Sequence, residues 1–465
     1  MAKKDDIVEL TIESLAYGGR AVARLDGMVV FVDGAIPGDR VSARIVRLKR
    51  DYAEAAAEEV IEPSPHRVEP RCPLFAVCGG CASQNIAYEE QLRQKANQVH
   101  EVLARIGRQS DLPIEPIRPS PSIWRYRNKM DFTFGTDRAG QFVLGLHRRG
   151  EYGGIVDVER CWLQPEPFDR AIEVVRQFTR RSGLPAYDPR SHKGFWRHLV
   201  LRHSVAEDRT LAVLITASGE LAGLDRLVEE LVAAETRLAG LVWAVNDSVA
   251  DVAACQEKRF AWGESALHER LGRLRFRVSP ISFFQVNTRA TEELYERVAE
   301  FVEANAALTL LDAYCGTGSI GIYCADRFAH VVGIESVRDA VRDARENAAL
   351  NGLGNCTFLC GQVKRMTALA RSFVGGRFGR VVVDPPRGGM DKRALARLLD
   401  LRPGALVYVS CNLATLARDV IAIAEAGYEI ERVQPFDLFP HTPHVETVIK
   451  FKMSHNEQRT MSDRQ

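Results

Sequence analysis

The sequence of 465 residues lacks the features of several specialised protein classes. It has no run of about eighteen apolar residues, the minimum for a membrane-spanning helix, so we expect no membrane partner. Its first six residues, Met1 to Asp6, lack the apolar core of a secretory signal, which favours a cytoplasmic protein. It also has no internal repeat. We therefore expect about three ordinary globular domains in a monomer.

A disulfide framework and a strong net charge are also absent. The ten cysteines are irregularly spaced and follow no signal sequence, so they do not predict a disulfide scaffold. The formal net charge is only +1, but residues 118–203 hold 16 Lys and Arg against 9 Asp and Glu. Because salt limits electrostatic attraction to a short range, a local basic patch can still bind phosphates.

The first part of the chain predicts a small β-barrel followed by a mixed domain. Residues 7–12 alternate apolar and polar side chains, and residues 28–32 form an apolar run between two Asp-Gly turns. This density of strands and turns favours an OB-type barrel over residues 1–62. Residues 70–280 predict a central α+β domain, which includes a polar helix that starts at Tyr88.

Residues 281–453 predict an α/β domain with a parallel, doubly wound sheet of the Rossmann type. Its expected strands are residues 308–311, 331–334, 357–359, 381–383, 405–409 and 445–451. Helical stretches such as residues 337–350 separate most of them. Ligands bind at the carboxyl ends of the strands in such sheets, so the residues that follow each strand are the site candidates. We expect residues 454–465 to be a frayed polar tail.

A glycine-containing loop follows the first of these strands, with the sequence Asp-Ala-Tyr-Cys-Gly-Thr-Gly-Ser at residues 312–319. Glu335 ends the next strand, where a carboxylate can accept both ribose hydroxyls. The loop lacks the third spaced glycine and the lysine of pyrophosphate-binding loops, so S-adenosylmethionine fits better than NAD. A strand-to-helix turn without a ligand is the alternative for the glycine pattern alone.

Two motifs follow the fourth and fifth strands, namely Asp-Pro-Pro-Arg from Asp384 and Ser-Cys-Asn around Cys411. A free cysteine is most often a packing residue, but this one is expected beside a methyl donor. Carbon 5 of uracil attacks a methyl group only after a thiolate has added to carbon 6. A base must then remove the proton from carbon 5, and Glu446 is the best candidate, with a surface carboxylate as the alternative.

Upstream of the predicted sheet lies Phe-Phe-Gln-Val-Asn at residues 283–287. The Gln285 amide can donate and accept, which suits a cofactor carboxylate or a base edge. Phe283 and Phe284 are either core residues or base-stacking residues, and the sequence leaves both interpretations open.

Four cysteines cluster around the start of the central domain. Cys72 and Cys78 enclose five residues, Cys78 and Cys81 enclose two, and Cys161 lies far downstream. Four thiolates suit either zinc or an iron–sulfur cluster, and the spacing alone leaves the metal open. Four unrelated cysteines are the remaining alternative.

Taken together, the motifs around Gln285, Asp384, Cys411 and Glu446 resemble the bacterial 5-methyluridine RNA methyltransferases, and the resemblance covers nearly the whole chain. The N-terminus resembles the TRAM domain of that family, an OB-type RNA-binding barrel, with the turn Tyr-Gly-Gly at residues 17–19. The resemblance therefore implies an S-adenosylmethionine-dependent enzyme that methylates carbon 5 of a uridine in RNA.

The resemblance also assigns residues. It makes Cys411 the nucleophile and Glu446 the base. It gives S-adenosylmethionine contacts to Gln285, Tyr314, Ser319, Glu335, Gln362 and Asp384, and it makes Cys72, Cys78, Cys81 and Cys161 the ligands of a 4Fe–4S cluster. Ser319 and Gln362 stand where other members often carry Asn, and both can still form hydrogen bonds.

The expected substrate is 23S ribosomal RNA, because the barrel together with the four cysteines most closely resembles the class that acts on it. The first alternative is the same chemistry on transfer RNA, whose enzymes share the catalytic motifs. A cytosine-5 methyltransferase would also need a cysteine, but with a group that protonates the ring nitrogen. A catalytically dead RNA-binding factor is the last alternative, although it would not need Cys411, Glu446 and Asp384 together.

Overall fold

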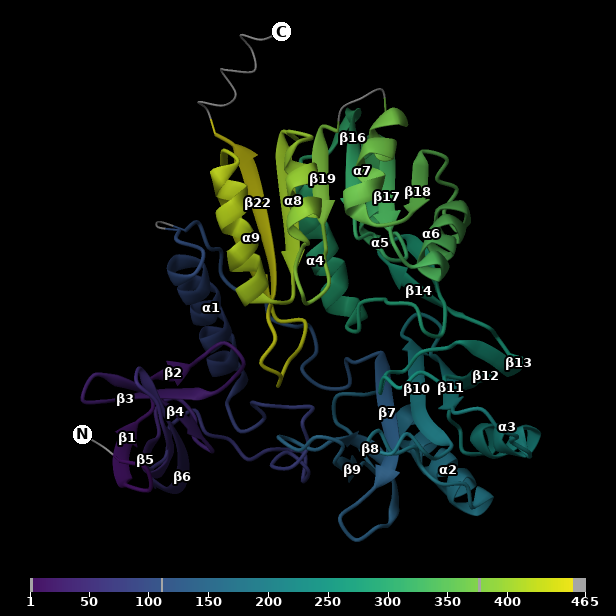
Figure 1. Ribbon diagram of the computed structural model, residues 1–465. Helices are drawn as coiled ribbons and strands as arrows, with labels where there is room; N and C mark the ends of the chain where they lie inside the picture. Colours follow the sequence, from purple (N-terminus) through teal and green to yellow (C-terminus); the bar gives the residue numbers. More distant parts are fainter. Residues whose placement is uncertain (1–2, 110–111, 375–377, 455–465) are drawn as a thin grey trace.

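The computed structural model describes residues 3–109, 112–374 and 378–454. It contains an N-terminal barrel, a central α+β domain and a C-terminal α/β domain that lies above both in Figure 1. The predicted polar tail lies outside the described residues except for Ser454. Among the helices of the described segments, none combines the length and the apolar character needed to cross a membrane.

The N-terminal barrel is built on one sheet with the strand order β1-β5-β6-β4-β3-β2. Its strands are β1 (Ile7–Thr11), β2 (Ser14–Leu15), β3 (Ala21–Leu25), β4 (Met28–Asp33), β5 (Arg40–Leu48) and β6 (Tyr52–Glu62). Val41, Ala43 and Ile45 of β5 are fully buried, as the period of two in a strand requires. The predicted barrel is therefore present, with a core of small and β-branched side chains.

The central domain has a sheet with the order β13-β12-β11-β10-β7-β8-β9. Its elements are β7 (Lys129–Thr136), β8 (Phe142–His147), β9 (Ile155–Asp157), α2 (Glu166–Ser182), β10 (Trp196–Ser204), β11 (Arg209–Thr216), α3 (Leu224–Ala233), β12 (Leu238–Val245) and β13 (Glu257–Gly263). The strands pair antiparallel except for β11 and β12. Both helices contribute to one hydrophobic cluster with this sheet.

The C-terminal domain has a seven-stranded sheet with the order β18-β17-β16-β19-β20-β22-β21. Its strands are β16 (Asn305–Ala313), β17 (Phe328–Glu335), β18 (Cys356–Cys360), β19 (Arg380–Val383), β20 (Ala405–Ser410), β21 (Tyr428–Phe436) and β22 (Glu446–Met453). Its helices are α4 (Thr288–Phe301), α5 (Ser319–Cys324), the short 3-10 helix η1 (Ala325–Arg327), α6 (Arg338–Leu350), α7 (Val363–Ser372), α8 (Lys392–Leu399) and α9 (Leu413–Glu425).

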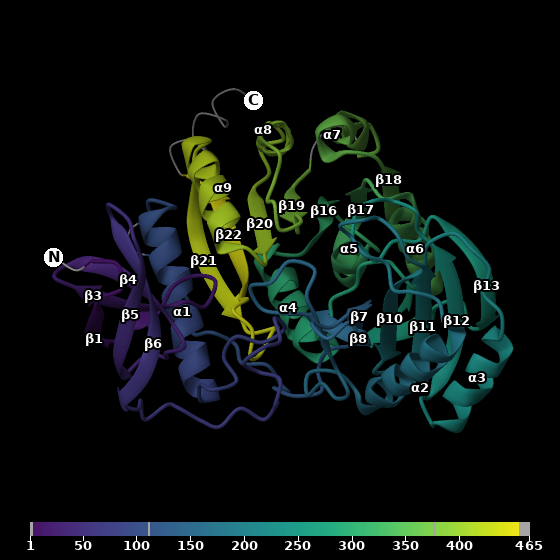
Figure 2. The same cartoon turned by 60° about the horizontal axis from the view of Figure 1, so that its bottom comes forward.

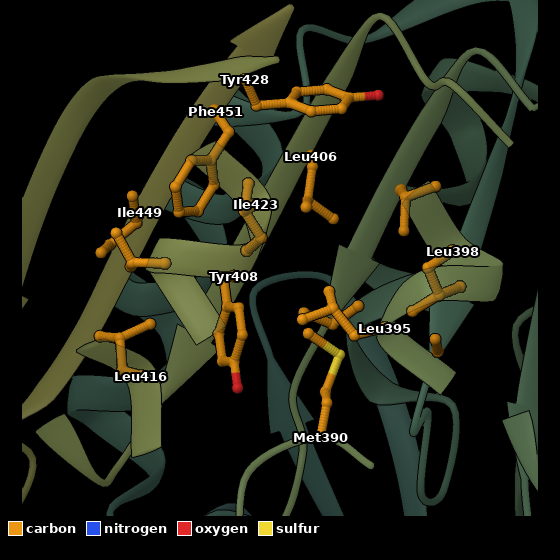
Figure 3. Close-up of a cluster of buried hydrophobic side chains, with 14 of the residues drawn as sticks. Met390, Leu395, Leu398, Leu406, Tyr408, Leu416, Ile423, Tyr428, Ile449 and Phe451 are labelled. Carbon is orange, nitrogen blue, oxygen red and sulfur yellow. The ribbon is translucent and has the colours of Figure 1, made fainter. Parts of the chain in front are cut away.

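Helices cover both faces of this sheet, as predicted for a doubly wound fold (Figure 2). Alternate residues of each strand point to opposite faces. Leu311 and Val381 belong to the cluster formed with α7, α8 and α9, whereas Leu310 and Val382 belong to the cluster formed with α4, α5 and α6. Figure 3 shows the first cluster, in which Tyr408 of β20 and Phe451 of β22 pack under the helices.

The prediction of a parallel sheet is wrong for one strand, β22, which runs in the opposite direction to the other six. The first five strands run parallel, but β22 pairs antiparallel with both β20 and β21. The sequence prediction missed β21, because this edge strand mixes charged and apolar residues instead of forming an apolar run. The chain therefore turns back between β21 and β22, and β22 inserts beside β20.

Two elements upstream of residue 281 pack on the C-terminal domain. Helix α1 (Tyr88–Arg105) lies beside α9, and its Val99 and Leu103 are fully buried in the cluster of Figure 3. The hairpin of β14 (Leu267–Leu271) and β15 (Leu274–Val278) packs on α6. Helix α1 also contacts β2, so it lies between the barrel and the C-terminal sheet (Figures 1 and 2).

Candidate active site

Strand pairing brings two of the predicted site residues together at the rim of the C-terminal sheet. Ser410, the last residue of β20, pairs with Thr447 of β22. Cys411 directly follows Ser410, and Glu446 directly precedes Thr447, so both leave the sheet at the same position. Asp384 follows the neighbouring strand β19. A thiol and two carboxyls therefore meet at the carboxyl ends of the parallel strands.

Burial and mutual repulsion dominate the electrostatics of this group. Burial raises the pKa of Asp384 to about 7. Burial, together with the charge of Asp384, raises the pKa of Glu446 well above its usual range, and Arg387 opposes this shift. Burial raises the pKa of the Cys411 thiol to about 12, to which the charges of Glu446 and Asp384 contribute. Without further positive charge, Cys411 is therefore a thiol at neutral pH.

Glu446 carries an unusual unpaired atom. The side chain is 2% exposed, and its Oε1 atom is buried without a hydrogen-bond partner among the described residues. A buried carboxylate oxygen normally has a partner, because an unpaired polar group in the interior costs free energy. The unpaired oxygen is in line with the raised pKa of Glu446, because burial disfavours the charged carboxylate.

The loop of Cys411 is fixed by the next residue, Asn412. The Asn412 Nδ2 atom donates to the Arg387 carbonyl at 2.9 Å, which ties this loop to the Asp-Pro-Pro-Arg loop. The Asn412 Oδ1 atom accepts from the backbone N–H groups of Ala414 and Thr415 and so caps the start of α9. The Ser-Cys-Asn motif contains Asn412, but its capping role was not predicted, although Asn before a predicted helix is a known capping signal.

A second buried group holds the other side of the Asp-Pro-Pro-Arg loop. The Asp419 carboxylate accepts from the Tyr408 hydroxyl at 2.8 Å and from the Met390 backbone N–H at 3.1 Å. Asp419 is 3% exposed and also pairs with Arg418. The Ser-Cys-Asn loop and the Asp-Pro-Pro-Arg loop are thus held by hydrogen bonds, those of Asp419 being buried and those of Asn412 lying nearer the surface, which reduces their conformational freedom.

Two histidines lie in the loop before β22. His441 is buried, its ring stacks on Trp124 with centroids 3.8 Å apart, and burial lowers its pKa to about 4. His444 Nε2 lies 3.0 Å from Arg387, and burial together with that charge lowers its pKa to about 4. Both imidazoles are neutral at pH 7. His441 therefore has a packing role, whereas His444 contacts the Asp-Pro-Pro-Arg loop.

Three of the predicted cofactor residues line one cavity. Tyr314, Glu335 and Gln362 surround a cavity of about 170 Å³ together with residues of the β18–α7 connection. Tyr314 has a φ of 66°, a left-handed conformation that is uncommon for a bulky residue and turns the chain sharply after β16. The Glu335 carboxylate accepts from the Gly316 and Val337 backbone N–H groups at 3.2 and 2.8 Å.

The glycine loop needs its glycines for two reasons. Gly318 has a φ of 77°, and a Cβ atom there would lie 2.9 Å from the Phe358 ring. The loop can therefore approach β18 and α6 only without a side chain at this position.

The other predicted cofactor residues lie on the α4 and α5 side of the rim. The Ser319 hydroxyl, at the start of α5, lies 2.7 Å from the Tyr295 hydroxyl of α4, and the charge of Asp384 helps to raise the pKa of Tyr295. Gln285 is 5% exposed and lies close before α4. The structure also separates the two phenylalanines, because Phe284 is buried in the core whereas Phe283 is 64% exposed.

The four predicted metal ligands line one pocket, called here the cysteine pocket. Its cavity measures about 460 Å³, and it includes Cys72, Cys78, Cys81 and Cys161 in its lining. Burial raises the pKa of Cys81 to about 12 and that of Cys161 to about 11. Within the described residues, no three His, Cys, Asp or Glu side chains are arranged to hold one metal ion. The pocket is therefore not a preformed site for a single ion such as zinc.

Comparisons with known proteins agree with this geometry. Residues 226–453 match the family described as tRNA (Uracil-5-)-methyltransferase, and residues 3–57 match the TRAM domain. The chain is 38% identical over 445 residues to an uncharacterized RNA methyltransferase of Halalkalibacterium halodurans, with 96% of each chain covered. It is 39% identical to one of Caldanaerobacter subterraneus, with 96% of this chain and 98% of the relative covered.

A solved structure resembles nearly the whole chain. The Pyrococcus abyssi tRNA (uracil-54, C5)-methyltransferase in complex with S-adenosyl-L-homocysteine matches with a TM-score of 0.75 and 29% identity, over 96% of this chain and all of the other. The prediction of an RNA methyltransferase with a TRAM domain is thus confirmed. The chain belongs to the S-adenosylmethionine-dependent RNA uracil-C5 methyltransferases.

Proposed function

We propose that this enzyme methylates carbon 5 of a specific uridine in 23S ribosomal RNA through a covalent bond between Cys411 and carbon 6 of the base. The observation that carries the proposal is the pairing of β20 with β22, which brings Cys411 and Glu446 together. The unpaired Oε1 atom of Glu446 suits a base that acts only when the substrate is present.

The proposed reaction begins at the Cys411 sulfur. The thiolate adds to carbon 6, and the electrons of the carbon 5–carbon 6 double bond move to the oxygen on carbon 4. S-adenosylmethionine would supply an electrophilic methyl group when bound. Carbon 5 would bond to that methyl group as its bond to the cofactor sulfur breaks, leaving S-adenosylhomocysteine. Glu446 then takes the proton from carbon 5. The double bond returns, and the bond between sulfur and carbon 6 breaks.

The raised thiol pKa sets a requirement for the first step. Burial disfavours the Cys411 thiolate in the free enzyme, and the charges of Glu446 and Asp384 add to this effect against the opposing charge of Arg387. A positive charge near the sulfur favours the thiolate, and S-adenosylmethionine carries one on its own sulfur. Cys411 is therefore expected to become a strong nucleophile only after the cofactor has bound, which protects the free thiol from unproductive reactions.

The residues around the cavity fit this cofactor. Glu335 ends β17 beside the cavity, where its carboxylate suits two ribose hydroxyls, and Tyr314 and Gln362 offer an aromatic face and an amide. Ser319, Gln285 and Asp384, which do not line this cavity, suit the amino-acid part of the cofactor. These six residues would hold S-adenosylmethionine, which would supply the methyl group for the reaction at Cys411.

We also propose that the cysteine pocket holds a 4Fe–4S cluster. Four cysteines around one cavity suit a cluster, whose ligand sulfurs lie farther apart than those around a single ion. Arg127, Arg148 and Arg149 also line the pocket and would offset the negative charge of four thiolates. The Gly80 N–H already donates to the Cys78 sulfur at 3.4 Å, as expected for amides around cluster sulfurs.

The RNA target is the part of the proposal with a competing candidate. The TRAM barrel together with the four cysteines supports 23S ribosomal RNA, by resemblance to the class that acts on it. The Pyrococcus enzyme is named as a tRNA (uracil-54, C5)-methyltransferase, and the structural similarity to it supports transfer RNA as the substrate instead.

The test is methyl transfer from labelled S-adenosylmethionine to purified substrates. Unmodified 23S ribosomal RNA should incorporate label as 5-methyluridine, whereas unmodified transfer RNA should not. Label in transfer RNA alone would show that transfer RNA is the substrate and would leave the proposed chemistry unchanged. Label in cytidine would point to the cytosine-5 alternative, and no label in either RNA would support an RNA-binding factor without activity.

A further inference from the structure

A turn of the N-terminal barrel reaches the loop of the proposed nucleophile. Tyr17 lies between β2 and β3, and its hydroxyl donates to Asn412 Oδ1 at 3.0 Å across 395 positions of sequence. Its ring also packs against the hydrophobic cluster of the C-terminal sheet. Asn412 is the residue next to Cys411, so a side chain of the RNA-binding barrel contacts the catalytic loop.

The contact with Tyr17 reaches a residue, Asn412, that makes several further hydrogen bonds. Its Oδ1 atom caps α9, and its Nδ2 atom holds the Arg387 carbonyl of the Asp-Pro-Pro-Arg loop. Its backbone N–H donates to the Ser410 hydroxyl at 3.1 Å. The Tyr17 hydroxyl therefore joins a network that orients the residues on both sides of Cys411.

The turn itself is held in place by buried residues of α1. Gln94 Oε1 accepts from the Leu15 N–H at 2.8 Å, and Gln98 Nε2 donates to the carbonyls of Leu15 and Ala16 at 3.1 Å. Both glutamines are at most 5% exposed. Tyr17 is thus presented on a rigid support, which a residue needs if it is to position another group.

Gly19 allows the turn to approach the loop before β22. It has a φ of 88°, and a Cβ atom at this position would lie 3.1 Å from the Cβ atom of Pro443. The turn therefore touches the active rim at two points, namely Asn412 beside Cys411 and Pro443 close to Glu446.

We propose that Tyr17 is a positioning residue of the methyl transfer, which holds Asn412 and through it the loop of Cys411. The inference rests on the proposed function, since it assumes that Cys411 is the nucleophile. It assigns the barrel a second role in addition to RNA binding, because one of its side chains completes the support of the active site.

The test uses full-length Tyr17→Phe, which removes only the hydroxyl. Loss of one neutral hydrogen bond predicts a fall in kcat of about three- to tenfold. The KM for RNA and the thermal unfolding midpoint should stay at wild-type values. Tyr52→Phe is the matched control, since it removes a hydroxyl from β6 of the same barrel and should leave kcat unchanged.

A double-mutant cycle with Asn412→Ala gives the second readout. If Tyr17 acts through Asn412, Tyr17→Phe should have no further effect on kcat in the Asn412→Ala background. Additive effects would overturn the inference, as would a rise in the KM for RNA at unchanged kcat, which would make Tyr17 an RNA contact.

Cys411→Ala distinguishes failure of the positioning role of Tyr17 from failure of the proposed function. If Cys411→Ala is inactive and Tyr17→Phe has wild-type kcat, the positioning role fails and the proposed function stands. If Cys411→Ala still turns over, the proposed function fails first, and the positioning role with it.

Discussion

The active rim and the cysteine pocket both contain buried thiols, but their neighbours differ. Burial raises the pKa of Cys411 and Cys81 to about 12 in each case. Cys411 faces Glu446, Asp384 and the cation Arg387, whereas Cys81 faces three other cysteines in a pocket with several arginines. Burial alone therefore does not assign a role to a thiol. A single thiol beside a carboxylate suits reversible addition to a base, and four thiols around one cavity suit a metal cluster.

The largest expected effect concerns the single thiol. Cys411→Ala should form no product, with residual turnover below about a hundredth of wild type, because no other group adds to carbon 6. Its affinity for S-adenosylmethionine, measured by calorimetry, should stay close to that of wild type. Higher residual turnover would contradict the nucleophile assignment and remove the contrast between the two regions.

The next effect concerns the four thiols. Protein purified without oxygen should be brown and contain about four irons per chain, and Cys161→Ala should lose most of that iron. Cys255→Ala, which changes an exposed cysteine outside the pocket, is the matched control and should keep its iron. Metal analysis that finds stoichiometric zinc and no iron would refute the cluster.

Glu446→Gln should lower turnover about a hundredfold or more, because a neutral amide cannot take the proton from carbon 5. Addition and methyl transfer should still occur, so an RNA adduct with labelled methyl should survive denaturing electrophoresis. The double variant with Cys411→Ala should lose the adduct, since the bond runs through the sulfur. Wild-type turnover without an adduct would make Asp384 the next candidate base.

The smallest effect tests the raised thiol pKa directly. A pKa of about 12 instead of 9 lowers the thiolate fraction at pH 8 about a thousandfold. A more basic thiolate is also a stronger nucleophile, which raises the rate again by about thirtyfold. Iodoacetamide should therefore alkylate Cys411 of the free enzyme about thirtyfold more slowly than a small exposed thiol. The rate, measured by mass spectrometry, should still rise above pH 9.

Variants of the charged residues around Cys411 should change its alkylation rate in opposite directions. Arg387→Ala removes a positive charge and should slow alkylation further, whereas Glu446→Gln removes a negative charge and should accelerate it. Equal rates in all three proteins would show that the neighbouring charges do not control the thiol.

The barrel, the α/β class and most strands of the C-terminal sheet could be predicted from local patterns. The barrel strands alternate with the period of two, and the central strands of the parallel sheet are continuous apolar runs. Asn412 had a capping signal and Tyr17 lay in a recognised turn, but their mutual contact had no signal, because 395 positions of sequence separate them.

The sequence alone determined the residue types of the site and their places after β19 and β20. Each motif directly follows a strand that can be predicted from its apolar run, so its position at the end of that strand is known. It did not determine that Glu446 and Cys411 meet. The first residue of a parallel strand would lie at the opposite rim of the sheet. Only the antiparallel pairing of β22 with β20, which depends on the unpredicted strand β21, brings Glu446 to the rim of Cys411.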